Sequence, residues 1–246
     1  CSPHEVVTAE QSSRSFEIGW PHESNVRLEL PFDMPTPPPT AGERTAERLL
    51  DAAEQLFAQR GTSVSVREIT TAAGANLASV SYHFGSKDGL LQSLLRRRLD
   101  PINDARLALL DQFEAAVPPG TPVPLEQIVE AFVRPALDPA ASPGPHFMQI
   151  MAHLHASHEP VAAQFFLEVF EPLVRRFLAS FTAALPDLPL ARLHLRMHFL
   201  VGATVHALMA QHSPKCPLPE DLASPLDPTD VLDEIVEFCA AGFRNG

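Results

Sequence analysis

Between Thr40 and Lys87 the chain carries helix start and stop signals at short intervals, and their spacing constrains the fold more than any other feature. The start signals are side chains that can accept a backbone amide hydrogen: Thr40, Ser65, Asn76 and Ser86. Glu43 and Glu68 follow the first two by three residues, which is the spacing of a capping box. The stop signals are glycines, which readily take the left-handed conformation of a helix end: Gly61, Gly74 and Gly85. We therefore predict helices over 42–60, 66–73 and 77–84, and a longer one from Lys87.

The apolar residues of this stretch recur every three or four positions, as they do on one face of a helix. In the first helix they are Ala46, Leu49, Leu50, Ala53, Leu56 and Phe57. Five apolar side chains of the two short helices are expected to pack against the first helix: Ile69, Ala73, Leu77, Val80 and Phe84. Val64 and Ile69 have the spacing of a hydrophobic staple, and Pro101 is expected to kink or break the helix from Lys87.

Further along, prolines separate stretches of helical periodicity. These stretches predict helices at 125–138, 146–157, 160–184, 189–212 and 228–243. No segment reads as a strand of a sheet and no internal repeat is found, so the predicted fold class is all-α. Residues 1–40 mix polar and acidic residues with a proline run that ends at Pro39, which predicts a disordered, Pro-rich tail.

The formal net charge of −12 is unevenly distributed along the chain. Residues 1–40 carry −4, residues 41–100 carry +1 and residues 101–246 carry −9. A polyanion is repelled by the two acidic blocks, so only the middle block is expected to bind one. The chain has no run of 18 apolar residues, no signal-peptide stretch in its first 40 residues and only three scattered cysteines. These features predict a cytoplasmic protein with reduced thiols and no membrane partner.

The two short helices and the glycine turn between them have the pattern of a helix-turn-helix. Packing of its apolar face leaves the second short helix with small or hydrogen-bonding side chains on the outside: Ala78, Ser79, Ser81, Tyr82 and His83. Such side chains suit a helix that lies in the major groove. Arg44, Arg67 and Lys87 flank it and could meet phosphates or a guanine edge. The triplet Arg96–Arg98 is more typical of a solvated face than of a phosphate clamp.

The run from Glu43, ERTAERLLDAAEQLFAQRGTSVSVREITTAAGANLASVSYHFGSKDGLL, resembles the DNA-binding domain of TetR-family transcriptional regulators. The match includes the Arg-Glu-Ile start of the second helix and the Tyr-His-Phe-x-x-Lys close of the third. The resemblance implies that nine residues contact DNA: Arg44, Ser65, Arg67, Ala78, Ser79, Ser81, Tyr82, His83 and Lys87. We therefore divide the chain into the tail 1–40, a three-helix helix-turn-helix DNA-binding domain at 41–88 and a helical ligand-binding and dimerisation domain at 89–246.

The stretches RMHFLVGATVHALMA and FCAAGFRNG, together with GANLASVSYHFGSK, are similar to the fatty-acid-responsive, PsrA-like group of that family. This resemblance implies an acyl chain in an apolar pocket of the helical domain. The candidate ligand-binding residues are Phe147, Met151, Phe166, Phe170, Arg196, Met197 and Val201. Arg192 is a second candidate, beside Arg196, for holding a carboxylate. The helices predicted at 189–212 and 228–243 are apolar on more than one face, and the resemblance implies that they pair with their copies in a homodimer.

The predicted function is that of a transcriptional regulator, a repressor that a hydrophobic small molecule releases from a pseudo-palindromic double-stranded operator, with Pro101 as a hypothetical pivot. No enzymatic activity, cofactor or metal is expected. Two alternatives remain open. One is a metal-dependent helical enzyme, because His194 and His198 lie at i and i+4 as a metal-binding pair would. The other is a helical dimer that binds a lipid or protein and not DNA.

Overall fold

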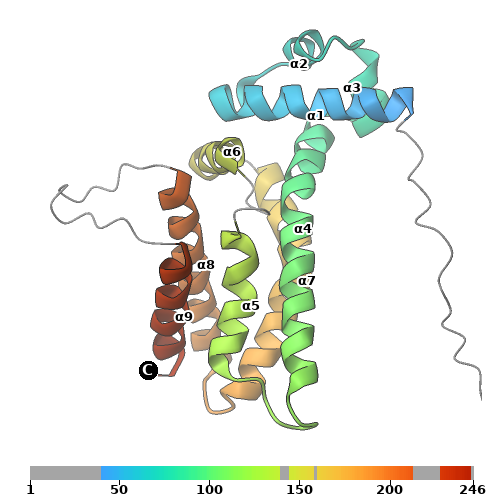
Figure 1. The fold of residues 1–246 in the computed structure, drawn as a ribbon. Coiled ribbons are helices and arrows are strands. Elements are labelled where there is room, and N and C mark those ends of the chain that lie inside the picture. The colour runs from blue at the N-terminus through green and yellow to red at the C-terminus, as the bar shows by residue number, and fades with distance from the viewer. Residues whose placement is uncertain (1–39, 139–143, 158–159, 213–227, 245–246) are drawn as a thin grey trace, which may run out of the picture. The chain divides into compact units, whose positions relative to one another are not determined.

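The computed structural model describes residues 40–138, 144–157, 160–212 and 228–244, and all regular structure in these ranges is helical (Figure 1). The elements are α1 (Ala41–Arg60), the 3₁₀ turn η1 (Gly61–Ser63), α2 (Val66–Ala72), α3 (Ala78–Phe84), α4 (Lys87–Ala116), α5 (Leu125–Leu137), α6 (Gly144–Ser157), α7 (Pro160–Ala184), α8 (Leu190–His212) and α9 (Pro228–Arg244). The predicted all-α class is confirmed. The expected tail and the prolines near residue 217 lie outside the described residues.

Helices α1 and α2 begin at the predicted capping signals, whereas α3 begins at Ala78, with Leu77 in place of Asn76 as its N-cap. Thr40 and Glu43 form a capping box at the start of α1, and Ser65 and Glu68 form another at the start of α2. The Asn76 side chain accepts the backbone amide of Ala78 at 3.0 Å, so it holds the first turn of α3. Helices α2 and α3 both contact α1, and the core between them includes the predicted Ile69, Ala73 and Val80.

One predicted core residue, Leu77, is placed differently. Helical spacing from Val80 directs it inward, but its side chain is 55% exposed. Leu77 stands immediately before α3, where no element of the described chain covers it. The prediction that Leu77 packs against the first helix is therefore wrong.

Helix α4 runs without interruption from Lys87 to Ala116 and includes Pro101. Of the two outcomes expected at Pro101, the break does not occur, and the kink stays a prediction. The Ser86 start signal is confirmed: its hydroxyl oxygen accepts the amide of Gly89 at 3.0 Å. A proline inside a helix costs about 3 kcal/mol. Leu99 and Ile102 on either side of it are buried, and each buried side chain of this size contributes about 1.5–3 kcal/mol, which offsets that cost. Whether Pro101 acts as a pivot stays a prediction.

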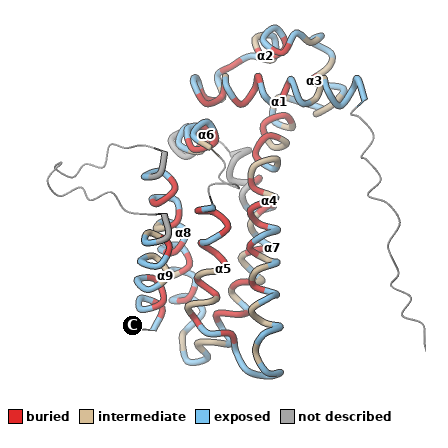
Figure 2. The backbone as a smooth tube through the Cα atoms, viewed as in Figure 1, coloured by how far each residue is buried: buried red, intermediate tan, exposed pale blue. Residues whose placement is uncertain are grey.

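The remaining helices extend the same core: α5 and α7 pack against α4, α6 packs against α1, and α8 and α9 pack against α5 (Figure 2). Helix α5 contacts α4, α7, α8 and α9, so it is surrounded by neighbours, and most of its residues are buried. Residues 39–246 form one compact unit, and the proposed domain boundary near residue 88 stays a prediction. No helix in the described ranges is both long enough and apolar enough to cross a bilayer.

Candidate nucleic-acid interface

Helix α3 divides its side chains between the core and the outside. Val80 is 1% exposed and Phe84 packs against the core, so the i and i+4 positions hold the helix in place. The other side chains of α3 are less covered: Ala78 and Ser81 are exposed and Tyr82 is 83% exposed, whereas Ser79 and His83 are half-buried, with the His83 ring close to Gly42 of α1. The five side chains predicted to read DNA are thus carried on one short, anchored helix. We call them the α3 outer face.

Glycine ends α3 so that the chain can turn directly into α4. Gly85 has φ +75°, a conformation that side chains with a Cβ rarely adopt, and its amide donates to the Ser81 carbonyl oxygen at 3.1 Å. Lys87 lies just beyond this turn. Its ammonium donates to the carbonyl oxygens of Thr62 at 2.6 Å and Val64 at 3.3 Å. Lys87 therefore ties α4 to the segment before α2 and keeps one of its three donors for another acceptor.

Three further predicted DNA contacts lie near the starts of α1 and α2. Arg44 and Arg67 are exposed. Ser65 is exposed as well, but both its donors are engaged: its amide and its hydroxyl donate to a Glu68 carboxylate oxygen at 2.9 and 2.7 Å. These bonds lower the pKa of Glu68 to about 2. In this structure Ser65 fixes the start of α2, and it has no donor left over for a phosphate.

In the arginine triplet at 96–98, Arg96 is exposed, whereas Arg97 and Arg98 pair with carboxylates of α1. Arg97 donates to Glu47, Asp51 and Glu54 at 3.1, 2.8 and 2.6 Å, and Arg98 binds Glu54 at 2.8 Å. These bonds join α4 to α1. Arg96 lies with its guanidinium carbon 5.6 Å from the ring centroid of Phe165 in α7. Arg97 and Arg98 therefore join two helices, and sequence spacing did not reveal their partners 43–50 residues away.

The predicted ligand-binding residues have different environments. Phe147 and Met197 are buried, and Met151 and Phe170 are half-buried against the core, so these four belong to the apolar interior. Val201 is 41% exposed. Arg196 donates to the Phe243 carbonyl oxygen at 2.5 Å and thereby joins α8 to α9, whereas Arg192 is exposed. The side chain of Phe166 lies outside the described residues.

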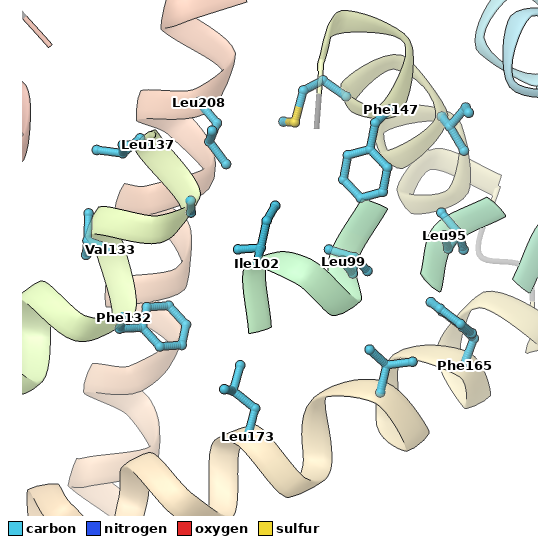
Figure 3. Close-up of a cluster of buried hydrophobic side chains, with 14 of the residues drawn as sticks. Leu95, Leu99, Ile102, Phe132, Val133, Leu137, Phe147, Phe165, Leu173 and Leu208 are labelled. Carbon is cyan, nitrogen blue, oxygen red and sulfur yellow. The ribbon is translucent and has the colours of Figure 1, made fainter. Parts of the chain in front are cut away.

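Apolar side chains from five helices converge in the interior, as Figure 3 shows. The labelled ones come from α4, α5, α6, α7 and α8, and Ile102 of α4 lies among Leu99, Phe132 and Leu173. A separate surface recess of about 250 Å³ lies at the loop 117–123, and none of the predicted ligand-binding residues lines it. Phe147, Met151, Phe170 and Met197 belong to the interior instead, and whether the predicted residues bind a ligand stays a prediction.

The histidine pair has no third ligand within the described ranges. His194 and His198 are both exposed, and the His198 ring nitrogen lies 2.8 Å from the His194 carbonyl oxygen. No group of three or more His, Cys, Asp or Glu side chains comes together there in a way that could hold a metal ion. Cys239 is a buried free thiol, and burial raises its pKa.

Two family models match the chain. Residues 49–94 match the model described as "Bacterial regulatory proteins, tetR family", and residues 130–242 match "Tetracyclin repressor-like, C-terminal domain". Together these matches take in more than half of the chain, with the α3 outer face inside the first and α8 inside the second.

Curated relatives match over shorter stretches. The transcriptional repressor KstR2 of Rhodococcus jostii is 42% identical over 74 residues, which are 27% of this chain and 35% of that protein. The transcriptional dual regulator CecR of Shigella flexneri is 41% identical over 49 residues, or 20% of this chain and 22% of that protein. The chain thus matches about a third or less of the length of these relatives.

Solved structures match over most of their length. A transcriptional regulator of the same family from Mesorhizobium loti has a TM-score of 0.55 at 16% identity, with 83% of this chain and 97% of that chain covered. The fatty acid degradation regulator FadR of Bacillus halodurans has a TM-score of 0.54 at 18% identity, with 80% and 98% covered. At these identities the likeness concerns the fold.

Proposed function

Since this chain belongs to the TetR family of bacterial regulatory proteins, we propose that it is a DNA-binding transcriptional repressor. The observation that carries the proposal is the α3 outer face, where Tyr82 is 83% exposed on a helix anchored by Val80. A large aromatic side chain projecting into water from a short, rigid helix has no role in the core. Tyr82 and its small and hydroxyl-bearing neighbours suit contacts in a DNA major groove. Arg44, Arg67 and Lys87 would contact the phosphates of the DNA backbone.

We propose that the protein acts as a homodimer through α8 and α9. Helix α8 exposes five large apolar side chains at i, i+4 spacing along two adjacent rows, and α9 exposes Phe238 at 75%. The side chains on α8 are Leu195, Phe199, Val201, Val205 and Met209. An exposed apolar surface of this extent is typical of an interface. Two copies joined there would present two α3 helices to a pseudo-palindromic operator on the bacterial chromosome.

We further propose that a hydrophobic small molecule, a long-chain fatty acid or acyl derivative, binds in the interior cluster and releases the DNA. The converging apolar side chains of Figure 3 support an apolar ligand, and a fold neighbour bears the name of a fatty acid degradation regulator. A ligand releases DNA only if it binds the non-operator conformation more tightly. A hundredfold loss of DNA affinity requires a difference of about 2.7 kcal/mol, which a few buried methylene groups can supply.

The α3 outer face can be tested without knowledge of the operator. Duplexes that the protein retains from a random-sequence pool should converge on a pseudo-palindrome, and they provide the DNA for a fluorescence anisotropy titration. Tyr82→Ala should weaken binding to these duplexes by tenfold or more. Since the Tyr82 side chain is almost fully exposed, the variant should unfold at the same temperature as the parent protein.

Arg175→Ala is the control, because Arg175 is exposed on α7 and pairs only with its neighbour Glu171 in the described chain. It should bind the selected duplexes as the parent protein does. Equal binding by Tyr82→Ala and Arg175→Ala, or a pool that never converges, would contradict the proposed function.

Mass spectrometry of molecules that copurify with the protein tests the effector, and recovery of acyl compounds that release the duplex is the expected result.

A further inference from the structure

Two charged side chains are buried in the described part of the chain, and their surroundings differ. Glu54 is 5% exposed and is bound by two arginines. Arg106 is also 5% exposed, but no described carboxylate lies within 4.0 Å of it. A buried charge without a counter-charge is strongly unfavourable. Burial accordingly lowers the pKa of Arg106 to about 10, where it remains a cation at neutral pH.

The hydrogen bonds of Arg106 are all to neutral groups. Its Nε donates to the Phe132 carbonyl oxygen at 2.7 Å, and one Nη donates to Asn103 Oδ1 at 3.1 Å. The guanidinium carbon lies 4.2 Å from the Phe132 ring centroid, and that ring meets Phe177 edge-to-face at 5.2 Å. These contacts hold the guanidinium plane in one orientation, yet they supply no negative charge.

Arg106 is positioned beside the interior cluster. Side chains on a helix tilt toward its N-terminus, and the bond to Asn103 places the guanidinium one turn back along α4, next to Ile102. Figure 3 shows Phe132 and Leu173 on either side of the part of α4 that carries Ile102. An oriented cation therefore lies at the edge of an apolar interior formed by several helices.

We propose that Arg106 receives the anionic group of the effector, so that the effector is an apolar molecule with a free carboxylate. This inference rests on the proposed function, because it names the chemical class of the molecule that releases the DNA. The carboxylate supplies the counter-charge that the described chain lacks, and two parallel hydrogen bonds can join it to the planar guanidinium. Arg196, the candidate from the sequence, is instead engaged with the Phe243 carbonyl oxygen between α8 and α9.

The test compares ligands that differ only in charge. Straight-chain carboxylates from hexanoate to palmitate, and the alcohols of equal chain length, are titrated into the full chain by isothermal titration calorimetry in the absence of DNA. The parent protein should bind the best carboxylate at least about tenfold more tightly than its alcohol. In Arg106→Met this preference should fall to within about twofold. Equal binding of acid and alcohol by the parent protein, or an unchanged preference in Arg106→Met, would overturn the proposal.

Two more variants distinguish a specific loss of carboxylate binding from a general loss of folded structure. Arg106→Gln keeps an amide donor for the Phe132 carbonyl oxygen while it removes the charge, and it too should lose the preference for the acid. Arg175→Met makes the same replacement at an exposed, paired arginine and should keep the preference. Both Arg106 variants should still bind the selected duplexes, but carboxylates should no longer release them. The calorimetric titration contains no DNA, so its outcome does not depend on DNA binding. Failure of the parent protein to bind any duplex would therefore contradict the proposed function but not the role of Arg106 in carboxylate binding.

Discussion

At the scale of single residues, Glu54 illustrates how a buried charge becomes tolerable. Its carboxylate accepts hydrogen bonds from Arg97 at 2.6 Å and from two nitrogens of Arg98 at 3.1 and 2.8 Å. Several charge-assisted bonds compensate for the loss of water around the carboxylate. Glu54 lies on α1 and both arginines on α4, so one carboxylate fixes the contact between the two helices.

Glu54→Gln should therefore lower the free energy of unfolding by about 2 kcal/mol, because two arginines lose their shared counter-charge. Glu171→Gln removes one carboxylate of the exposed Glu171–Arg175 pair and should change the same quantity by less than about 0.5 kcal/mol. Urea unfolding followed by circular dichroism, at one protein concentration, measures both. Equal losses of unfolding free energy in Glu54→Gln and Glu171→Gln would mean that the buried ion pairs of Glu54 stabilise the protein no more than an exposed pair does.

At the scale of elements, the turn between α3 and α4 determines how the α3 outer face is presented. Gly89, in the first turn of α4, lies so close to the end of α3 that a Cβ at this position would be 2.0 Å from the Phe84 carbonyl oxygen. The obstacle is backbone and cannot rotate away. The absence of a side chain at Gly89 therefore permits the close approach of the two helices.

Gly89→Ala should displace α3 from α4 and weaken binding to the selected duplexes by tenfold or more, with a loss of stability of about 1–3 kcal/mol. Arg175→Ala is again the control, because Arg175 is exposed on α7 and pairs only with Glu171 in the described chain. That control should bind DNA normally. Anisotropy titrations and thermal unfolding of both variants check the prediction, and normal DNA binding by Gly89→Ala would contradict it.

The elements themselves were largely predictable from the sequence, whereas contacts between distant residues were not. The caps of α1 and α4 and the helical stretches from 125 onward agree with the structure within two residues, because capping and periodicity are local properties. Pro101 was expected to kink or break its helix, and the helix is not broken because burial of Leu99 and Ile102 outweighs the local cost of proline. The sequence did not single out Arg106, because its burial without a carboxylate partner depends on the packing of α5 against α4.

At the scale of the whole molecule, apolar surface and charge are distributed unevenly along the chain. The acidic C-terminal residues repel DNA, yet α8 exposes Phe199 at 65% and Leu195 at 53%. A second copy of the chain would cover these side chains and bring two α3 helices together.

Phe199→Glu should convert the dimer to a monomer, because a carboxylate on each copy would be buried without a partner. Leu167→Glu introduces the same charge at an equally exposed apolar residue of α7 and should leave the dimer intact. Sedimentation equilibrium of both variants measures the association. A dimeric Phe199→Glu, or dissociation by both variants alike, would contradict pairing through α8.

Leu77 stands at the leading end of α3 with more than half of its side chain in water. An isobutyl group has no donor or acceptor to offer a base edge, but it can cover the C5-methyl group that thymine alone displays in the major groove. Each half-site is therefore expected to contain a thymine at the position that Leu77 meets, and replacement of that thymine by cytosine or uracil removes the apolar contact. Leu77 would then contribute to the sequence specificity of DNA binding and not to the packing of α3.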